Sequence, residues 1–342
     1  MPKSSPAVRI AFIIGLWATL ACVLPAPVFA IIREQSFPSS TDPNFDRELI
    51  MDKTVTRLTK ILSVDAGYRV DNLDWNIAGT LAGTSPNVLS ELTWEDIQSF
   101  EVAAALKGPF WKNVYARGRF SYGWIYHGQN QDSDYHGDNR TLEFSRSRNS
   151  TDDGSVVDAT LGFGYQFSLS QDRLKLSPLL GFARHEQNFK MTDGNQITDP
   201  YGEIGWLGPF EGLNSTYDAA WSGPWLGLDF ELYPFDKLSF SGNLEHHWVD
   251  YDGVGDWNLR PDLAHPQSFA HSAEGTGHKA SIAGHYKLNK RWRLNASFEY
   301  YNFSTDEGTD TTHAASGLTD DTQLNEVNWD AGSFKFGAAY LW

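Results

Sequence analysis

The chain has 342 residues, and its 27 Lys and Arg against 43 Asp and Glu give a formal net charge of -16 at pH 7. An acidic excess of this size argues against nucleic acid or another polyanion as a partner. The one cysteine, Cys22, lies in an apolar stretch near the N-terminus, so the rest of the chain offers no thiolate for a disulfide, for catalysis or for a metal.

Residues 1–30 have the pattern of a cleaved secretory signal. Lys3 and Arg9 are positive, an apolar run follows them, and small residues precede the expected cleavage site. A transmembrane anchor is the alternative, but the apolar run is short and prolines follow it. We therefore expect a signal peptide over 1–30, a periplasmic segment over 31–60 and a single exported domain over 61–342.

The exported part has no apolar run long enough for a membrane helix, and its apolar residues instead recur every second position. In "NVYARGRFSYGWIYH", Val114, Phe120 and Trp124 share one face, while Arg117 and Arg119 share the other. Segments of about ten alternating residues with aromatic ends are typical of a transmembrane β-barrel. A soluble β-sandwich also alternates, but the uniform segment length and the many Trp and Tyr residues favour the barrel.

Ten such segments predict an all-β fold, a ten-stranded antiparallel transmembrane barrel. The expected strands cover residues 61–78, 90–106, 112–128, 155–169, 173–189, 217–234, 237–252, 274–288, 290–304 and 328–342. Short turns join them at one end, and long polar loops join them at the other, over residues 79–89, 129–154, 190–216, 253–273 and 305–327. Such barrels have short periplasmic turns and long extracellular loops. We therefore expect an outer-membrane protein.

The last residues, Phe334 to Trp342, place aromatic side chains on one face and end on an aromatic residue. This pattern resembles the C-terminal signal by which outer-membrane barrels are recognised for insertion, with Trp342 in place of the usual Phe. The expected partners are therefore outer-membrane lipid, the barrel-insertion machinery and a surface ligand of unknown identity. The barrel is expected to be a monomer.

The polar face of the predicted strands carries charges of both signs. Those expected to point inward are Asp65, Arg69, Glu95, Glu101, Arg117, Arg119, Asp158, Asp229, Glu231, Glu245, Arg293 and Lys335. A ten-stranded barrel is narrow enough for side chains to fill. Because an unpaired buried charge is costly, we expect these groups to pair across the lumen as a polar plug. An open small-solute pore is the alternative.

Ten strands, five long loops and the phrase "SELTW" (Ser90–Trp94) resemble the omptin family of outer-membrane proteases. Omptins carry an Asp-x-Asp pair and an Asp-x-His pair that face each other across a groove at the barrel rim. The resemblance implies that "DSD" places Asp132 and Asp134 at the first pair. The best match to the second pair is Asp256-Trp257-Asn258, which has Asn258 at the histidine position.

In omptins the Asp-His pair is understood to activate the water that attacks the peptide bond. A neutral Asn amide cannot take a proton near pH 7, and losing a positioned base typically lowers the rate about 10²- to 10⁴-fold. We therefore expect an incomplete proteolytic site and a surface barrel with a binding or structural role. The alternative is an endopeptidase in which His136, His265 or His271 serves as a displaced base.

Other expected contacts also depend on resemblance. The lipopolysaccharide-binding pattern of omptins corresponds to "FARHE" (Phe182–Glu186), which has Arg184 and Glu186 in reversed order, so Arg184 alone remains as a candidate contact. Lipopolysaccharide is thus a possible bound lipid. No cofactor and no metal are expected, because the acidic loops lack the spacing of a calcium loop and no zinc spacing occurs.

The stretch "DWNLRPDLAHPQSF" is similar to the Protochlamydia outer membrane protein family, for which a porin role has been proposed. In this stretch Trp257 and Arg260 are expected to anchor the loop at the rim. Arg260 is expected to pair with an acidic neighbour, for which Asp132 and Asp134 are the candidates, and an Arg that bridges these two would be a structural lock in place of a catalytic dyad.

Overall fold

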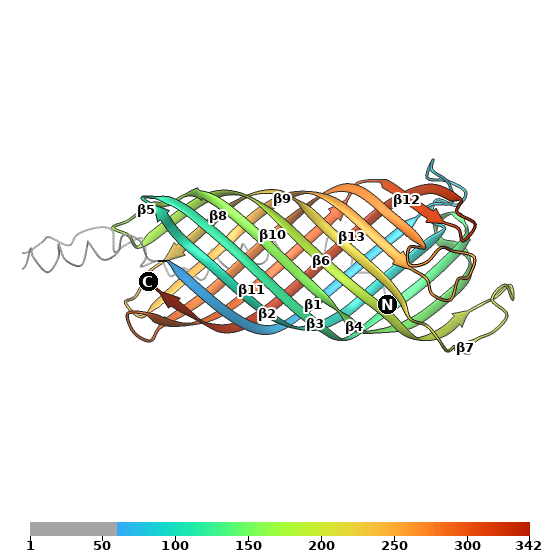
Figure 1. Cartoon of the computed structure of the whole chain (residues 1–342), viewed down its shortest axis with the longest axis horizontal. Helices are drawn as coiled ribbons and strands as arrows, with labels where there is room; N and C mark the ends of the chain where they lie inside the picture. Colours follow the sequence, from blue (N-terminus) through green and yellow to red (C-terminus); the bar gives the residue numbers. More distant parts are fainter. Residues whose placement is uncertain (1–59) are drawn as a thin grey trace, which may run out of the picture. The chain divides into compact units, whose positions relative to one another are not determined.

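The computed structural model describes residues 60–342, which form one closed antiparallel sheet (Figure 1). The expected signal peptide over 1–30 and periplasmic segment over 31–60 lie outside the described residues, apart from Lys60. Ten long strands form the ring in chain order, and pairing of β1 with β13 closes it. Among residues 60–342, no helix is long and apolar enough to cross a membrane.

The ring confirms the ten predicted strands. Its members are β1 (Ile61–Ile77), β2 (Ser90–Trp111), β3 (Val114–Gly137), β4 (Thr141–Tyr165), β6 (Leu174–Thr198), β8 (Ser215–Leu232), β9 (Leu238–Asp256), β10 (Phe269–Lys287), β11 (Trp292–Thr305) and β13 (Thr319–Leu341). Three short strands, β5 (Phe167–Leu169), β7 (Gly208–Pro209) and β12 (Gly308–His313), pair with its ends, and a 3-10 turn, η1 (Asp138–Arg140), joins β3 to β4.

The strands run further outward than predicted. The stretch 129–154, expected to be a loop, is the upper half of the β3–β4 hairpin and turns at η1. β10 and β13 likewise begin inside predicted loops. On β3 the exposed side chains of Trp124 and Tyr126 form part of an outward aromatic belt, and the strand continues beyond them to Gly137. The extracellular end of the barrel, which carries β7 and β12 in Figure 1, is therefore built of sheet.

The apolar face of the strands changes side along the barrel. On β1, Tyr68 points outward and is exposed, whereas Leu73 and Trp75 are buried inside. On β13, Phe336 is exposed outside and Trp329 is buried inside. In the periplasmic half of the barrel, here called the lower barrel, lipid stabilises apolar side chains that point outward. Around the extracellular half, the upper barrel, water favours burial of apolar side chains in the interior. The change of side between Tyr68 and Leu73 therefore marks the outer boundary of the membrane-spanning part of β1.

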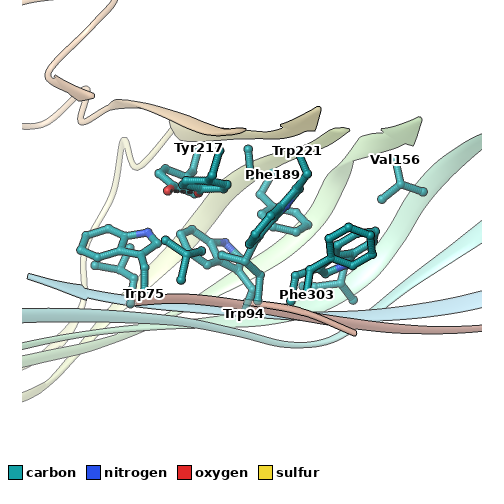
Figure 2. Close-up of a cluster of buried hydrophobic side chains, with 14 of the residues drawn as sticks. Trp75, Trp94, Val156, Phe189, Tyr217, Trp221 and Phe303 are labelled. Atoms are coloured by element: carbon teal, nitrogen blue, oxygen red, sulfur yellow. Dashed lines mark hydrogen bonds between the residues drawn. The ribbon is translucent and has the colours of Figure 1, made fainter. Parts of the chain in front are cut away.

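The inward apolar side chains of the upper barrel form one buried cluster, here called the aromatic plug (Figure 2). Its members are Leu73, Trp75, Leu92, Trp94, Ile97, Ile125, Val156, Phe189, Met191, Tyr217, Ala219, Trp221, Val249, Tyr251, Phe269, Tyr301, Phe303, Leu324, Val327, Trp329 and Ala331. The rings of Trp94 and Tyr217 stack with centroids 5.0 Å apart, and those of Trp221 and Tyr251 lie 4.5 Å apart. The expectation of an interior filled only by polar groups was wrong for this half of the barrel.

Below the plug, charged side chains pair across the lumen as predicted. Arg69 forms ion pairs with Asp71 (2.8 Å) and Asp158 (2.5 Å), and all three side chains are at most 3% exposed. Arg119 lies 3.0 Å from Glu101, and further pairs extend this network toward the periplasmic end. The charges are thus compensated inside a low-dielectric interior, where an isolated ion would be costly.

One predicted inward residue, Glu95, is exposed. The register between β2 and β3 shifts between Glu95 and Gln98, and Asp96 has a φ of 53°. A bulge of this kind reverses which residues face inward. Trp94 therefore enters the aromatic plug, where it is 0% exposed, and Glu95 turns outward.

Candidate functional site

Asp132 and Asp134, here called the Asp pair, lie on β3 beyond the outward aromatic belt. Asp132 is opposite Leu92 and Asp134 is opposite Ser90 on β2. Directly opposed residues of an antiparallel pair share one face of the sheet. Since Leu92 belongs to the aromatic plug, the Asp pair faces the lumen and lies at the outer end of the plug.

The Asp pair is electrostatically unusual. Burial raises the pKa of Asp132 well above the usual carboxyl range, and the charge of Asp134 raises it further, while Arg260 opposes this. Asp132 Oδ1 is buried and has no hydrogen-bond partner. Burial also raises the pKa of Asp134, although hydrogen bonds from Ser90 and Ser145 oppose the rise. Two buried carboxylates this close do not both ionise readily, so the pair retains a proton to higher pH than isolated carboxyl groups.

Asp256 ends β9 on the other face of the sheet. Tyr251 and Gly255 are buried inside, the register of β9 with both neighbours is unbroken there, and Asp256 opposes Thr216. Strand alternation therefore turns Asp256 away from the lumen. His265 Nδ1 lies 2.6 Å from Asp256 Oδ1, and both side chains are partly exposed. Asp256 and His265 thus form an outer pair at the rim.

Trp257 takes the inward place next to Asp256. Its ring meets that of Phe269 edge-on, with centroids 4.6 Å apart, so it packs onto the aromatic plug. Arg260 donates hydrogen bonds to Asp262 from Nε (2.9 Å) and Nη2 (2.6 Å). Arg260 thus pairs with an acidic neighbour as expected, but that neighbour is Asp262 and not the Asp pair, although the positive charge of Arg260 acts on both carboxylates of the pair.

Asn258, which the resemblance to omptins placed at the histidine position, makes hydrogen bonds to the segment before β8. Its Oδ1 accepts hydrogen bonds from Asn214 N (2.8 Å) and Ser215 Oγ (3.0 Å), and its Nδ2 donates to the carbonyl oxygen of Gly212 (2.7 Å). The Asn amide accepts hydrogen bonds through its oxygen and donates them through its nitrogen. A neutral imidazole has one donor and one acceptor nitrogen, at different positions. Asn258 therefore links the β9–β10 connection to the segment before β8.

The two remaining candidate bases lie elsewhere. His136 is exposed on β3, with Nε2 2.8 Å from Glu203 Oε1. His271 was expected in a loop, but it lies on β10 inside the lumen, where it is 2% exposed. Its Nδ1 lies 2.9 Å from the Tyr217 hydroxyl and its Nε2 3.2 Å from Asp310 Oδ1. His271 is therefore a polar member of the plug region, a position that the sequence pattern did not reveal.

The candidate lipopolysaccharide contact, Arg184, lies on β6 with an exposed side chain and donates from Nε to Glu186 Oε1 at 2.5 Å. Phe182, two residues earlier on the same face, is 57% exposed. The pair therefore lies on the outer wall of the barrel. Within residues 60–342, no group of three or more His, Cys, Asp or Glu side chains is arranged to hold a metal ion.

A solved structure of an outer-membrane barrel shares this fold. The outer membrane protease OmpT from Escherichia coli aligns with a TM-score of 0.69 at 12% identity, over 83% of this chain and 97% of that chain. OprG from Pseudomonas aeruginosa aligns at 10% identity over 84% and 97%, with a TM-score of 0.32. The match to OmpT shows a shared fold and, at 12% identity, does not show a shared activity. None of the curated proteins matches the chain.

The family model of the Protochlamydia outer membrane protein matches residues 63–341, which is nearly the whole described barrel. The match covers all ten strands of the ring, the aromatic plug and the rim. The outer-membrane location expected from the strand pattern agrees with this match and with the OmpT fold. The chain belongs to the Protochlamydia outer membrane protein family and is an outer-membrane β-barrel with an omptin-like fold.

Proposed function

We propose that this protein is a closed, non-hydrolytic barrel that binds a ligand or partner at the cell surface. The observation that carries the proposal is the opposite facing of the two acidic centres: the Asp pair faces the lumen and Asp256 faces away from it. A general base must lie within hydrogen-bond reach of the attacking water. Two centres on opposite faces of the wall cannot hold one water and one peptide bond between them.

The rim residues also support a structural role. Trp257 fills the inward position beside Asp256 by packing on Phe269, and Asn258 is occupied by three hydrogen bonds. Neither side chain is free to activate water. The outer pair of Asp256 and His265 could hold a water, but the Asp pair that an omptin-like site would set opposite it faces the lumen.

A binding role is supported by apolar side chains on the extracellular connections. Tyr201, Trp206, Leu207 and Leu318 are 53%, 52%, 63% and 73% exposed, and all four follow the outer ends of strands. Large apolar side chains exposed on loops above a rigid scaffold are typical of interaction sites. The aromatic plug argues against the alternative of a small-solute pore, since it leaves the upper lumen filled.

The test is cleavage of a mixed peptide library by the refolded barrel with lipopolysaccharide added. Wild type, Asp132→Ala and His265→Ala are compared, and OmpT serves as the positive control. We expect no cleavage by any of the three proteins. Cleavage by wild type that is lost in either variant would overturn the proposal in favour of an endopeptidase, and its loss in His265→Ala would identify His265 as the displaced base. Cleavage retained in both variants would point to a contaminating protease, which repurification would remove.

A further inference from the structure

A cavity of about 120 Å³ lies in the lower lumen, on the periplasmic side of the aromatic plug. Its lining begins at Ile61 and Lys107, which pair at the periplasmic ends of β1 and β2, and reaches Glu299 in the ion-pair network. The charged side chains of the lining are Lys107, Arg117, Arg119, Lys279, Arg293, Asp65, Asp229 and Glu299. The cations therefore outnumber the carboxylates by five to three.

Three of these cations are already compensated. Lys107 lies 2.8 Å from Glu231, and Arg117 lies 2.9 Å from Glu245. Arg119 lies 3.0 Å from both Glu101 and Glu299. These cations are parts of the wall, because their charges are neutralised within it.

Lys279 and Arg293 are different. They are 4% and 7% exposed, and neither makes a hydrogen bond or an ion pair with another side chain of residues 60–342. Lys279 Nζ lies 5.1 Å from the centre of the Tyr301 ring, and Arg293 Nε is buried without a partner. The charges of Glu245 and Glu299 act on Lys279 without contacting it. A buried cation without a contact partner is costly, so both groups favour an anion in the cavity.

We propose that this cavity binds a small oxyanion, a phosphate or carboxylate group, through Lys279 and Arg293. Arg presents a planar fork that matches two oxygens of such a group, and Lys adds a compact charge. A small oxyanion needs about the space of two waters, roughly 60 Å³, which the cavity exceeds. The carboxylates of Asp65 and Glu299 in the lining repel additional negative charge. The cavity therefore favours a single small anionic group over a polyanion.

This site is independent of the proposed surface function, because the aromatic plug separates the cavity from the rim. Titration calorimetry of the refolded full-length mature barrel in detergent, at low chloride, provides the test. Inorganic phosphate and acetate are titrated separately into wild type, Lys279→Met, Arg293→Gln and Arg293→Lys. Lys290→Gln, which removes an exposed cation from the β10–β11 turn, is the matched control.

We expect wild type and Lys290→Gln to bind phosphate, acetate or both with millimolar or tighter Kd. Each of Lys279→Met and Arg293→Gln should weaken binding about 10-fold or more, because a charge-assisted hydrogen bond contributes a factor of this size. Arg293→Lys should recover part of the loss. Binding of phosphate alone assigns a phosphate-type ligand, and binding of acetate as well assigns carboxylates also.

A further variant tests the cavity without altering its charged groups, in case the charge variants fail to fold. Ala283→Leu narrows the cavity without changing any charge, and it should weaken binding as the charge variants do. Each variant is checked for the heat-dependent gel mobility of a folded barrel. The proposal is overturned if wild type binds neither anion in the millimolar range, or if folded Lys279→Met, Arg293→Gln and Ala283→Leu all bind as wild type does.

Discussion

His265 Nδ1 and Asp256 Oδ1 lie 2.6 Å apart, on the face of β9 that is turned away from the lumen. The contact places a His beside an Asp, as the expected Asp-x-His match at Asn258 does not, but the Asp pair lies on the opposite face of the barrel wall. Proximity of two residue types is therefore a weaker indication of function than the face of the strand from which they project.

The outer pair is expected to hold the β9–β10 connection in place. His265→Ala should increase the rate at which proteinase K cleaves residues 257–268 in intact cells, while changing the free energy of unfolding by less than about 1 kcal/mol, because the pair is partly exposed. His136→Ala is the control, since its partner Glu203 lies in another connection. Equal cleavage rates in wild type and His265→Ala would contradict this role.

Stability should depend on the titration of Asp132. Burial raises the pKa of Asp132 in the folded protein. In the unfolded chain an Asp has a pKa of about 3.9, so above this pH the folded protein holds a proton that the unfolded chain has lost. The resulting stabilisation is complete below that pH and is lost as the pH rises through the folded-state pKa. Asp132→Asn cannot titrate, so it should match wild type near pH 3.5 and be more stable at about pH 8. Urea unfolding in detergent at both pH values measures this.

Asp262 gives the matched control with the opposite sign. Its hydrogen bonds from Arg260 lower its pKa to about 2, so its stabilisation is present at neutral pH and is lost as the pH falls toward 2. Asp262→Asn should therefore be slightly less stable than wild type at neutral pH, by a small amount because the side chain is exposed. If Asp132→Asn and Asp262→Asn change the free energy of unfolding in the same direction at neutral pH, burial does not explain the behaviour of Asp132.

The aromatic plug should block ion flow. Wild-type barrels in planar bilayers should pass no steady current, whereas the double variant Trp94→Ala/Trp221→Ala should show conductance steps. Truncating one fully buried Trp costs about 3–5 kcal/mol, so each single variant should also unfold at lower urea. Trp248→Ala is the control, because Trp248 is 48% exposed on the outer face. Steady current through wild type would restore the pore alternative.

Removing a single charge from the lower lumen should lower the free energy of unfolding. Arg69→Met leaves Asp71 and Asp158 buried without their cation, and breaking a buried ion pair from one side costs about 3–5 kcal/mol. Urea unfolding of the refolded barrel measures the loss. Arg184→Met, which removes an exposed partner of Glu186, should change stability by about 1 kcal/mol or less. Similar losses of stability in both variants would show that the buried ion pairs of Arg69 contribute no more than an exposed pair does.

Much of the fold was predictable because its causes are local. Contact with lipid requires an apolar side chain at every second position of a membrane-spanning strand. The strands, their number and their outward face could therefore be predicted from the alternation in the sequence. The pairing of lumen charges was also predictable, since Arg69 and Glu101 fall on inward positions of regular strands. Their particular partners were not, because strands far apart in the chain meet across the lumen only in the closed barrel.

By itself, the sequence determined a ten-stranded outer-membrane barrel, while the resemblance to omptins only singled out Asp132 and Asp134 as a candidate pair and Asn258 at the histidine position. Only the tertiary structure decided which face each rim residue takes. The bulge between Glu95 and Gln98 turns Trp94 inward, while the unbroken register of β9 turns Asp256 outward. Shifting a strand by one residue reverses the facing of every side chain, and register is fixed by pairing with other strands. The aromatic plug arises for the same reason, since water outside the upper barrel leaves only the interior for its apolar side chains.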